Sequence, residues 1–135
     1  MSITIHTDGG SRSNPGPAGI GVHATQNKIV IFTLSEFLGT QTNNYAEYTA
    51  VIRALETCIE KKLTSETIDF FMDSKLVVEQ VQGNWKVKEP TLRPLVARVH
   101  ELMKHFPSVT FTHVRREYNK EADELANKAM DEAEN

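Results

Sequence analysis

The segment TDGGSRSNPGP, residues 7–17, closes the first strand that the sequence predicts. Residues 3–6 alternate between isoleucine and polar side chains, which is typical of a half-buried strand, so Asp8 falls at its carboxyl end. Gly9 and Gly10 allow a backbone or a ligand to approach this carboxylate closely. Taken alone, the segment also fits a glycine-rich turn that opens with an aspartate, so its meaning depends on the rest of the chain.

Hydrophobic periodicity further along the chain predicts four more strands and four helices. The strands cover residues 18–24, 28–38, 67–72 and 109–114. The helices run from the polar junction at residues 40–44 to about Lys62, from Ser74 to near Gly83, from Leu92 to Phe106 and from Asn119 onward. We expect the acidic tail of the last helix, residues 131–134, to fray.

The order of these elements predicts an α/β fold. Short turns join the first three strands, which indicates an antiparallel meander, and the later strand–helix–strand segments require right-handed parallel crossovers. The predicted architecture is a mixed five-stranded sheet, three antiparallel strands and then two parallel ones, with helices on both faces. A length of 135 residues and a mass of 15.2 kDa fit a single domain over residues 1–135.

Bulk composition narrows the possible functions. With 15 basic and 18 acidic residues the net charge is −3, which argues against indiscriminate nucleic-acid binding but permits a local basic patch. No apolar run is long enough to span a membrane, and Met1 leads into a strand and not into a signal peptide. The single cysteine, Cys58, lies in a helical pattern and is interpreted as a core residue. We therefore expect a cytoplasmic protein without a membrane partner.

Four carboxylates are candidates for a common site. If the fourth strand pairs with the first, Asp8 and Asp73 become neighbours at the sheet edge where α/β proteins usually bind ligands. Glu47, in the first turn of the first helix, and Asp123, near the start of the last, are positioned to join them. Two alternatives remain open from the residues alone: Glu47 forms a capping box with Asn44, and Asp123 is an ordinary exposed helix acid.

Adjacent carboxylates repel one another unless they are protonated or bridged by a cation. A cluster of four acids without paired bases favours hard cations with oxygen ligands, namely Mg²⁺ or Mn²⁺. Two such ions suit an in-line displacement at a phosphodiester. The sequence therefore predicts a metal-dependent nuclease.

Four motifs in order resemble the type 1 ribonuclease H family, over essentially the whole chain. They are TDGGS with NPGPAG at residues 7–11 and 14–19, TNNYAE at 42–47, MDS at 72–74 and EADELA at 121–126. The resemblance implies the ribonuclease H-like fold. It also implies endonucleolytic hydrolysis of the RNA strand of RNA–DNA hybrids, leaving 5′-phosphate and 3′-hydroxyl ends.

By the same resemblance, the catalytic and metal-binding residues are Asp8, Glu47, Asp73 and Asp123. The cofactor implied is a pair of Mg²⁺ ions, with Mn²⁺ as a substitute. In this family pattern Asp8 bridges both ions, and Asp123 helps to hold the ion that activates the attacking water. Glu47 and Asp73 hold the second ion, beside the leaving 3′ oxygen.

The resemblance also implies a set of substrate contacts. They are Gly9, Gly10, Ser11, Arg12, Asn14, Thr42, Asn43, Asn44, Ser74 and Trp85. The glycine backbone approaches the RNA minor groove, the asparagines bind sugars and base edges, and Thr42 and Ser74 contact the DNA strand. Trp85 stacks on a DNA sugar, although the residue type fits equally well a tryptophan that covers the core. Lysines and arginines of the following connector add phosphate contacts or simply form a solvated face.

Two departures from the family pattern place the chain in a short branch. The connector at residues 115–120 contains no histidine, whereas many members carry one there that assists product release. Residues 83–94 are too few and too lightly charged for the basic protrusion that other members possess. We expect modest, salt-sensitive affinity for substrate and a possible side activity on double-stranded RNA. Either Arg116 or Glu117 is available to replace the histidine.

Two other functions fit the same fold. A non-catalytic module that binds RNA–DNA hybrids is the main alternative, but retained carboxylates would repel phosphates unless metal is present. A transposase or junction resolvase of the wider superfamily is the other, and the family-specific segments at residues 7–19 and 42–44 favour a hybrid nuclease over it. The expected partner is therefore an RNA–DNA hybrid, bound by a monomer.

Overall fold

A computed structural model describes residues 1–134. The strands are β1 (Ser2–Ser11), β2 (Gly16–Gln26), β3 (Ile29–Gln41), β4 (Thr67–Met72) and β5 (Val109–His113). The helices are α1 (Asn43–Glu60), α2 (Lys75–Val81), α3 (Arg93–Met103) and α4 (Lys120–Ala133), with short 3₁₀ turns at Pro90–Leu92 and Arg116–Tyr118. Within this range no helix combines the length and apolar character that a membrane crossing requires.

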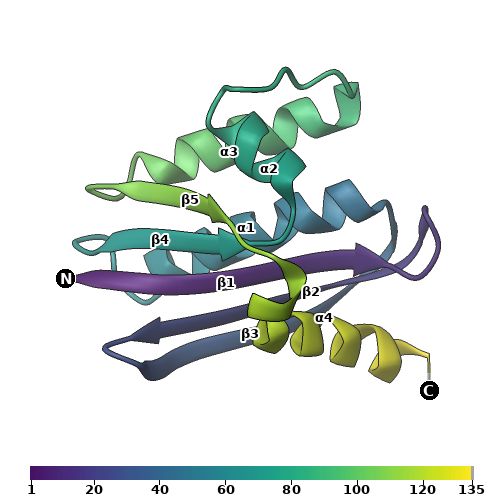
Figure 1. Ribbon diagram of the computed structural model, residues 1–135, viewed down its shortest axis with the longest axis horizontal. Helices are drawn as coiled ribbons and strands as arrows, with labels where there is room; N and C mark the ends of the chain where they lie inside the picture. Colours follow the sequence, from purple (N-terminus) through teal and green to yellow (C-terminus); the bar gives the residue numbers. More distant parts are fainter. Residues whose placement is uncertain (135) are drawn as a thin grey trace.

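The five strands form one sheet in the order β3-β2-β1-β4-β5 (Figure 1). β1, β2 and β3 pair antiparallel, whereas β4 pairs parallel to β1 and β5 parallel to β4. This arrangement confirms the predicted mixed sheet. It also makes β1 the central strand, so the carboxylate that β1 carries lies in the middle of the sheet.

The hairpin of β2 and β3 is longer than predicted. Backbone pairing continues from the turn as far as Gly16 opposite Gln41, beyond the predicted limits of residues 18–24 and 28–38. The extra residues are mostly polar and pair through their backbones, so hydrophobic alternation does not report them. Asn27 and Lys28 form the turn with positive φ angles, the conformation that a tight hairpin requires.

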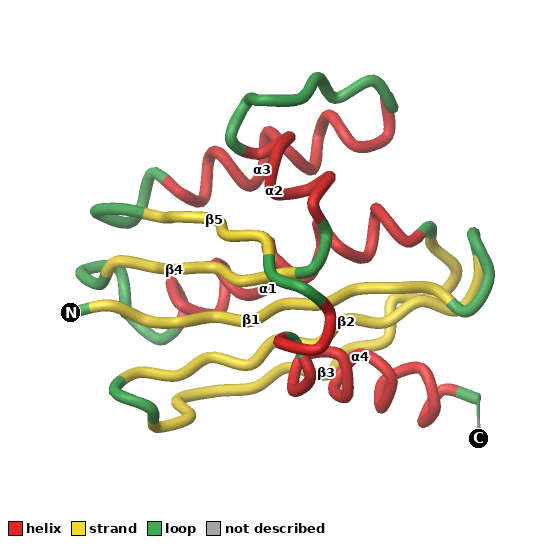
Figure 2. The backbone as a smooth tube through the Cα atoms, in the orientation of Figure 1, coloured by secondary structure: helices red, strands yellow, loops and turns green. Residues whose placement is uncertain are grey.

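Helices cover both faces of the sheet, as predicted (Figure 2). α1 packs on β1 and β2 on one face, with α3 beside it, and α4 packs on β2 and β3 on the other. The main core lies between the sheet and α1–α3, and it includes the fully buried Cys58. Burial raises the pKa of the Cys58 thiol to about 12, which agrees with its interpretation as a core residue.

Close approach of α4 requires small residues on β2. A Cβ at Gly21 would lie against the backbone carbonyl of Ala122 and 2.6 Å from the amide nitrogen of Ala126. A Cβ at Gly19 would lie 2.9 Å from the carbonyl oxygen of Ala126. Gly21 is the register partner of Asp8, so the helix that rests on this glycine also lies next to the central carboxylate.

The start of α1 differs from one prediction. Thr42, and not Asn44, is the N-cap, because the Thr42 hydroxyl accepts a hydrogen bond from the backbone N–H of Tyr45 at 3.2 Å. The capping-box interpretation of Glu47 was therefore wrong. A threonine cap satisfies the helix terminus without a carboxylate, which frees Glu47 for other contacts. Ser74 does cap α2 as predicted, accepting from the N–H of Val77.

The tail of α4 also differs from its prediction. The helix continues to Ala133 and does not fray after Met130. Arg12, from the segment after β1, forms ion pairs with Asp131 at 2.6 Å and Glu134 at 3.1 Å. These pairs neutralise acids that would otherwise repel one another in the last turn, so a contact distant in sequence orders the tail.

Candidate active site

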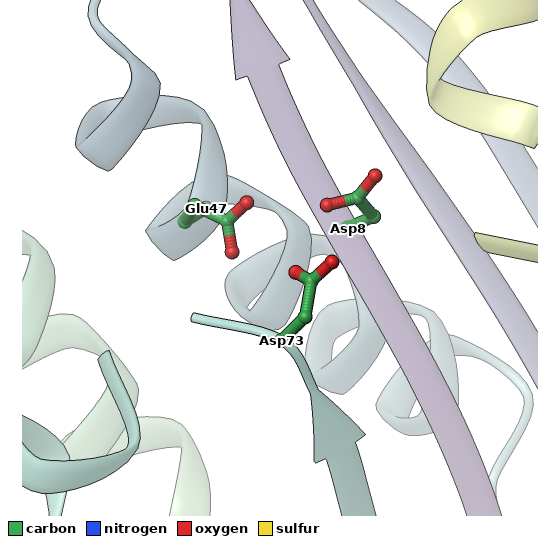
Figure 3. Close-up of side chains that lie close together, drawn as sticks. All are labelled: Asp8, Glu47 and Asp73. Carbon is green, nitrogen blue, oxygen red and sulfur yellow. The ribbon is translucent and has the colours of Figure 1, made fainter. Parts of the chain in front are cut away.

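Three carboxylates converge at the end of the β1–β4 pairing (Figure 3). Thr7 and Met72 form the last pair of these parallel strands, so the next residue of each, Asp8 and Asp73, emerges at the same edge. Glu47 approaches from the first turns of α1. One carboxylate oxygen from each of the three lies within 4.8 Å of the others. The structure therefore brings together three of the four acids that the sequence singled out.

Gly9 explains how Glu47 reaches the strand ends. The α1 backbone at Ala46 lies so close to Gly9 that no side chain fits there, and the N–H of Gly9 donates to Glu47 Oε1 at 3.2 Å. The glycine after Asp8 thus has two roles: it admits the helix and it orients the carboxylate. The sequence predicted the close approach but not which backbone makes it.

Burial and mutual repulsion change the acidity of all three groups. The pKa of Asp8 is raised to about 8, first by burial and then by the charges of Asp73 and Asp123. Burial, and then the charges of Asp8 and Asp73, hold the pKa of Glu47 well above its usual range. The pKa of Asp73 is also raised by burial, against an opposing backbone hydrogen bond and the Arg116 charge. The cluster therefore favours protonation or a compensating cation over its full negative charge.

The donor set fits a hard divalent ion. All three groups offer oxygen ligands, and within the described residues no cysteine or histidine joins this cluster. Magnesium and manganese prefer such carboxylate ligands, and a bound cation would offset the repulsion that raises the pKa values.

Asp123 is not one of the three acids whose oxygens lie mutually within 4.8 Å, but it lines the same cavity and acts on the acidity of Asp8. It sits in the first turn of α4, is partly exposed, and lies 3.6 Å from Nη2 of Arg116. The cavity has a volume of about 600 Å³ and is walled by the three clustered acids, by Asp123 and by Arg116. Asp123 therefore faces the cluster from α4, on the opposite side of the sheet from α1.

Most of the predicted substrate contacts line this cavity. Those that do are Gly9, Gly10, Ser11, Arg12, Asn43, Asn44 and Ser74. Trp85 instead lines a second cavity of about 580 Å³, and Asn44 lines both. Asn14 and Thr42 are not among the lining residues of either cavity. Eight of the ten predicted contacts thus line one or both of two cavities that share Asn44.

Several of these side chains bond within the protein. Asn43 Oδ1 accepts from the backbone N–H of Ser11 at 2.7 Å and from its hydroxyl at 3.1 Å. Asn14 Oδ1 accepts from the N–H of Asn43 at 3.1 Å. The guanidinium of Arg12 is held by the acids of α4. These bonds brace the segment after β1 against the starts of α1 and α4.

Comparison with known proteins agrees with this geometry. The sequence profile of the reverse transcriptase-like family matches residues 6–129. A ribonuclease H of Ruthia magnifica is 34% identical, over 96% of this chain and 95% of its own length. The chain belongs to the ribonuclease H family. This confirms the family resemblance of the four motifs.

Two further similar proteins are a solved structure of similar length and a longer mycobacterial protein. The crystal structure of LC11-RNase H1 in complex with an RNA/DNA hybrid matches with a TM-score of 0.93 and 46% identity, covering 98% of this chain and 99% of that one. The bifunctional protein Rv2228c of Mycobacterium tuberculosis is 42% identical over 98% of this chain. The match covers 36% of Rv2228c, so the ribonuclease H-family chain spans about a third of that relative.

Asn119 is a residue of this ribonuclease H-family site that the sequence interpretation missed. It is fully buried, and its Nδ2 donates to the carbonyl of Thr7 at 2.8 Å. Its own carbonyl accepts from the N–H of Asp123 at 3.1 Å. One residue therefore ties the strand position before Asp8 to the helical turn that carries Asp123. An asparagine just before a helix usually signals a cap, and Asn119 makes no side-chain cap bond.

Replacing Asn119 with Ala should destabilise the protein by about 1–3 kcal/mol, because it leaves the buried carbonyl of Thr7 without its donor. Urea unfolding followed by circular dichroism measures this change. Asn84→Ala is the matched control, because its amide makes only exposed bonds, and it should cost less than about 0.5 kcal/mol. Equal losses in the two variants would contradict the bridging role.

Proposed function

We propose that this chain is an endoribonuclease that hydrolyses the RNA strand of RNA–DNA hybrids and leaves 5′-phosphate and 3′-hydroxyl ends. The observation that carries the proposal is the convergence of Asp8, Glu47 and Asp73 on a ribonuclease H fold. A relative that is 46% identical, LC11-RNase H1, was solved in complex with an RNA/DNA hybrid, which supports the same substrate here.

In this proposal Asp8, Glu47, Asp73 and Asp123 hold two Mg²⁺ ions, with Mn²⁺ as a substitute. When bound, such ions lower the pKa of a coordinated water and offset charge on the phosphate that is cleaved. The protein itself fixes the carboxylates in place. Gly9 donates to Glu47, and the Arg116 guanidinium lies beside Asp123. Arg116 or the neighbouring Glu117 takes the role of the missing histidine in this proposal.

The two cavities suggest where each strand of a hybrid duplex binds. The backbone of Gly9, Gly10 and Ser11 follows the RNA minor groove near the carboxylates, where 2′-hydroxyls are accessible. Trp85 receives the DNA strand in the second cavity, and Asn44 lies between the strands. The remaining proposed contacts are Arg12, Asn14, Thr42, Asn43 and Ser74. Arg12 reaches a phosphate only by exchanging its ion pairs with α4 for a substrate contact.

The proposed enzyme acts as a monomer in the cytoplasm, where the buried thiol of Cys58 stays reduced. A side activity on double-stranded RNA belongs to the same proposal. The alternative of a non-catalytic hybrid-binding module is tested by the same experiment.

The test is cleavage of one end-labelled sequence prepared as RNA–DNA, RNA–RNA, DNA–DNA and single-stranded RNA, each with Mg²⁺, Mn²⁺ or chelator. We expect cleavage of the RNA strand of the hybrid, dependent on metal, with products that carry 3′-hydroxyl ends. Weaker cutting of RNA–RNA would establish the side activity. Folded protein that binds the hybrid but cuts nothing in any metal would establish the binding module instead.

A further inference from the structure

The second cavity is built by a short connector between α2 and the 3₁₀ turn at Pro90–Leu92. Residues 82–89 supply Trp85, Lys86 and Lys88 to its wall, and Leu76 and Gln80 of α2 supply the base. The indole of Trp85 is 44% exposed, so its position is not fixed by burial in the core. Something other than core packing of the indole must therefore set where this segment lies.

A buried pair of polar side chains reaches this connector from α1. Tyr48 is fully buried, and its hydroxyl donates to Oε1 of Gln80 at 2.7 Å. Gln80 is 6% exposed, and its Nε2 donates to the backbone carbonyl of Lys86 at 3.2 Å. The direction of this chain of bonds is fixed, because a carbonyl only accepts and the amide nitrogen must therefore face Lys86.

The pair belongs to elements that border the carboxylate cluster. Tyr48 follows Glu47 on α1, and Gln80 belongs to the short helix α2 that begins two residues after Asp73. The chain of bonds therefore joins α1, which carries Glu47, and α2, which follows Asp73, to the connector that carries Trp85. Phenylalanine at position 48 and methionine at position 80 would fill the same space with apolar atoms. What the polar pair adds is therefore a set of directional hydrogen bonds that holds the connector.

Two backbone bonds also reach the connector: the N–H groups of Asn84 and Trp85 donate to the carbonyl of Glu79 at 2.9 and 3.2 Å, but they end before Lys86. The remaining contacts are weaker constraints. Arg93 Nε donates to the carbonyl of Val87 at 3.3 Å in an exposed position, and Lys75 Nζ lies 6.0 Å from the Trp85 ring centroid. Exposed contacts of this kind compete with water and contribute little order. Val87 packs partly against the core, and the carbonyl of Lys86 before it is bonded by Gln80.

We propose that Tyr48 and Gln80 are positioning residues that set the affinity for the strand opposite the one that is cleaved. They do so by holding the backbone at Lys86, and with it the Trp85 ring, at the mouth of the second cavity. The identity of that strand rests on the proposed hybrid-nuclease function. The ordering of the connector does not, because it is a property of the free protein.

The test compares Tyr48→Phe, Gln80→Met and their double variant with a matched control, Thr57→Val. Thr57 is equally buried on α1, and its hydroxyl donates within the helix to the carbonyl of Arg53, far from the connector. Two readouts are needed: kcat and KM on the hybrid, and acrylamide quenching of Trp85 without substrate. Trp85 is the single tryptophan of the chain, so its fluorescence reports the connector alone.

We expect Gln80→Met to raise KM about tenfold, about 1.4 kcal/mol, with kcat changed by less than about twofold. In this variant the quenching constant of Trp85 fluorescence by acrylamide should rise by about 50% or more, because the connector becomes mobile. The double variant should resemble Gln80→Met, because the two side chains act as one unit. Thr57→Val should lower the melting temperature and change neither readout. Tyr48→Phe removes a single oxygen, so the same two readouts are taken on this variant if Gln80→Met fails to fold.

The outcomes separate the two proposals. If wild type cleaves the hybrid but KM and Trp85 quenching stay unchanged in folded Gln80→Met, the positioning role is overturned and the proposed function stands. If quenching rises while KM stays unchanged, the connector is ordered by Gln80 but does not govern affinity, which also overturns the inference. If wild type does not act on the hybrid and quenching still rises, the proposed function fails while the ordering of the connector by Gln80 is supported.

Discussion

Replacing Asp8 with Asn is expected to abolish cleavage and, in metal-free buffer, to make the protein more stable. The substitution keeps the size of the side chain but removes the charge that a divalent ion requires, so activity should fall at least about 10³-fold. Stability should rise because the native cluster loses a buried charge that repels Asp73 and Glu47. Initial rates on the hybrid and thermal unfolding in chelator measure the two effects.

The sign of the pH dependence follows from the raised pKa of Asp8. Its pKa is about 8 in the folded protein, against about 4 in an unfolded chain, so the folded state holds an extra proton between these values. The stabilisation from this group is complete below about pH 4 and is lost as pH rises through about 8. Wild type in chelator should therefore melt at a lower temperature at pH 8 than at pH 5. Asp8→Asn should show a smaller decrease.

The same melting measurement is repeated with added Mg²⁺. The ion should raise the melting temperature of wild type at pH 8, because it binds the folded carboxylates, and should do so far less in Asp8→Asn. Glu101→Gln is the control: it removes one exposed charge from α3, far from the cluster, and should leave activity and the Mg²⁺ response intact. Full activity in Asp8→Asn would refute the metal-site assignment.

Gly9→Ala is expected to be among the most destabilising single substitutions, costing more than about 3 kcal/mol. A methyl group there would lie against the backbone carbonyl of Ala46 and 2.6 Å from the amide nitrogen of Glu47. Both neighbours belong to the backbone of α1, so relief requires the helix to move away from the sheet. That movement would also break the bond that orients Glu47.

Gly10→Ala is the matched comparison, one residue further along the same strand. The nearest atom to its new Cβ is Oδ1 of Asn43 at 3.8 Å, an ordinary contact, so stability should change by less than about 1 kcal/mol. Urea unfolding of the two variants by circular dichroism compares them directly. Similar losses at Gly9 and Gly10 would show that α1 does not depend on the missing side chain.

The sheet and the carboxylate cluster were predictable because they depend on short-range patterns. Alternating and helical periodicity placed every strand and helix, and the similar positions of Asp8 and Asp73 predicted that the two carboxylates meet. The prediction that Asp8 ends its strand was wrong, because β1 continues past Asp8 to Ser11 through backbone pairing with β2. The choice of Thr42 over Asn44 as a helix cap was not predictable, because both residues are good caps and neighbouring contacts decide between them.

What the sequence did not reveal depends on contacts between distant segments. The tail of α4 was expected to fray because it is acidic. The partner of its acids is Arg12, near the other end of the chain. Asn119 and Gln80 act through hydrogen bonds to backbone carbonyls. Every residue has such a carbonyl, so the sequence does not indicate which one is the acceptor. Placement of Asp123 relative to the cluster likewise depends on how closely α4 approaches Gly21.

Assembly of the cavity from both the first strand and the last helix has a consequence for synthesis. A ribosome adding about 5–20 residues per second delivers Asp8, Glu47 and Asp73 early and Asp123 on the order of ten seconds after Asp8. During that interval β2 lacks the helix that rests on Gly21, and the cavity lacks the wall that α4 provides. We therefore expect the complete cavity, and any activity that depends on Asp123, to form only after α4 has docked.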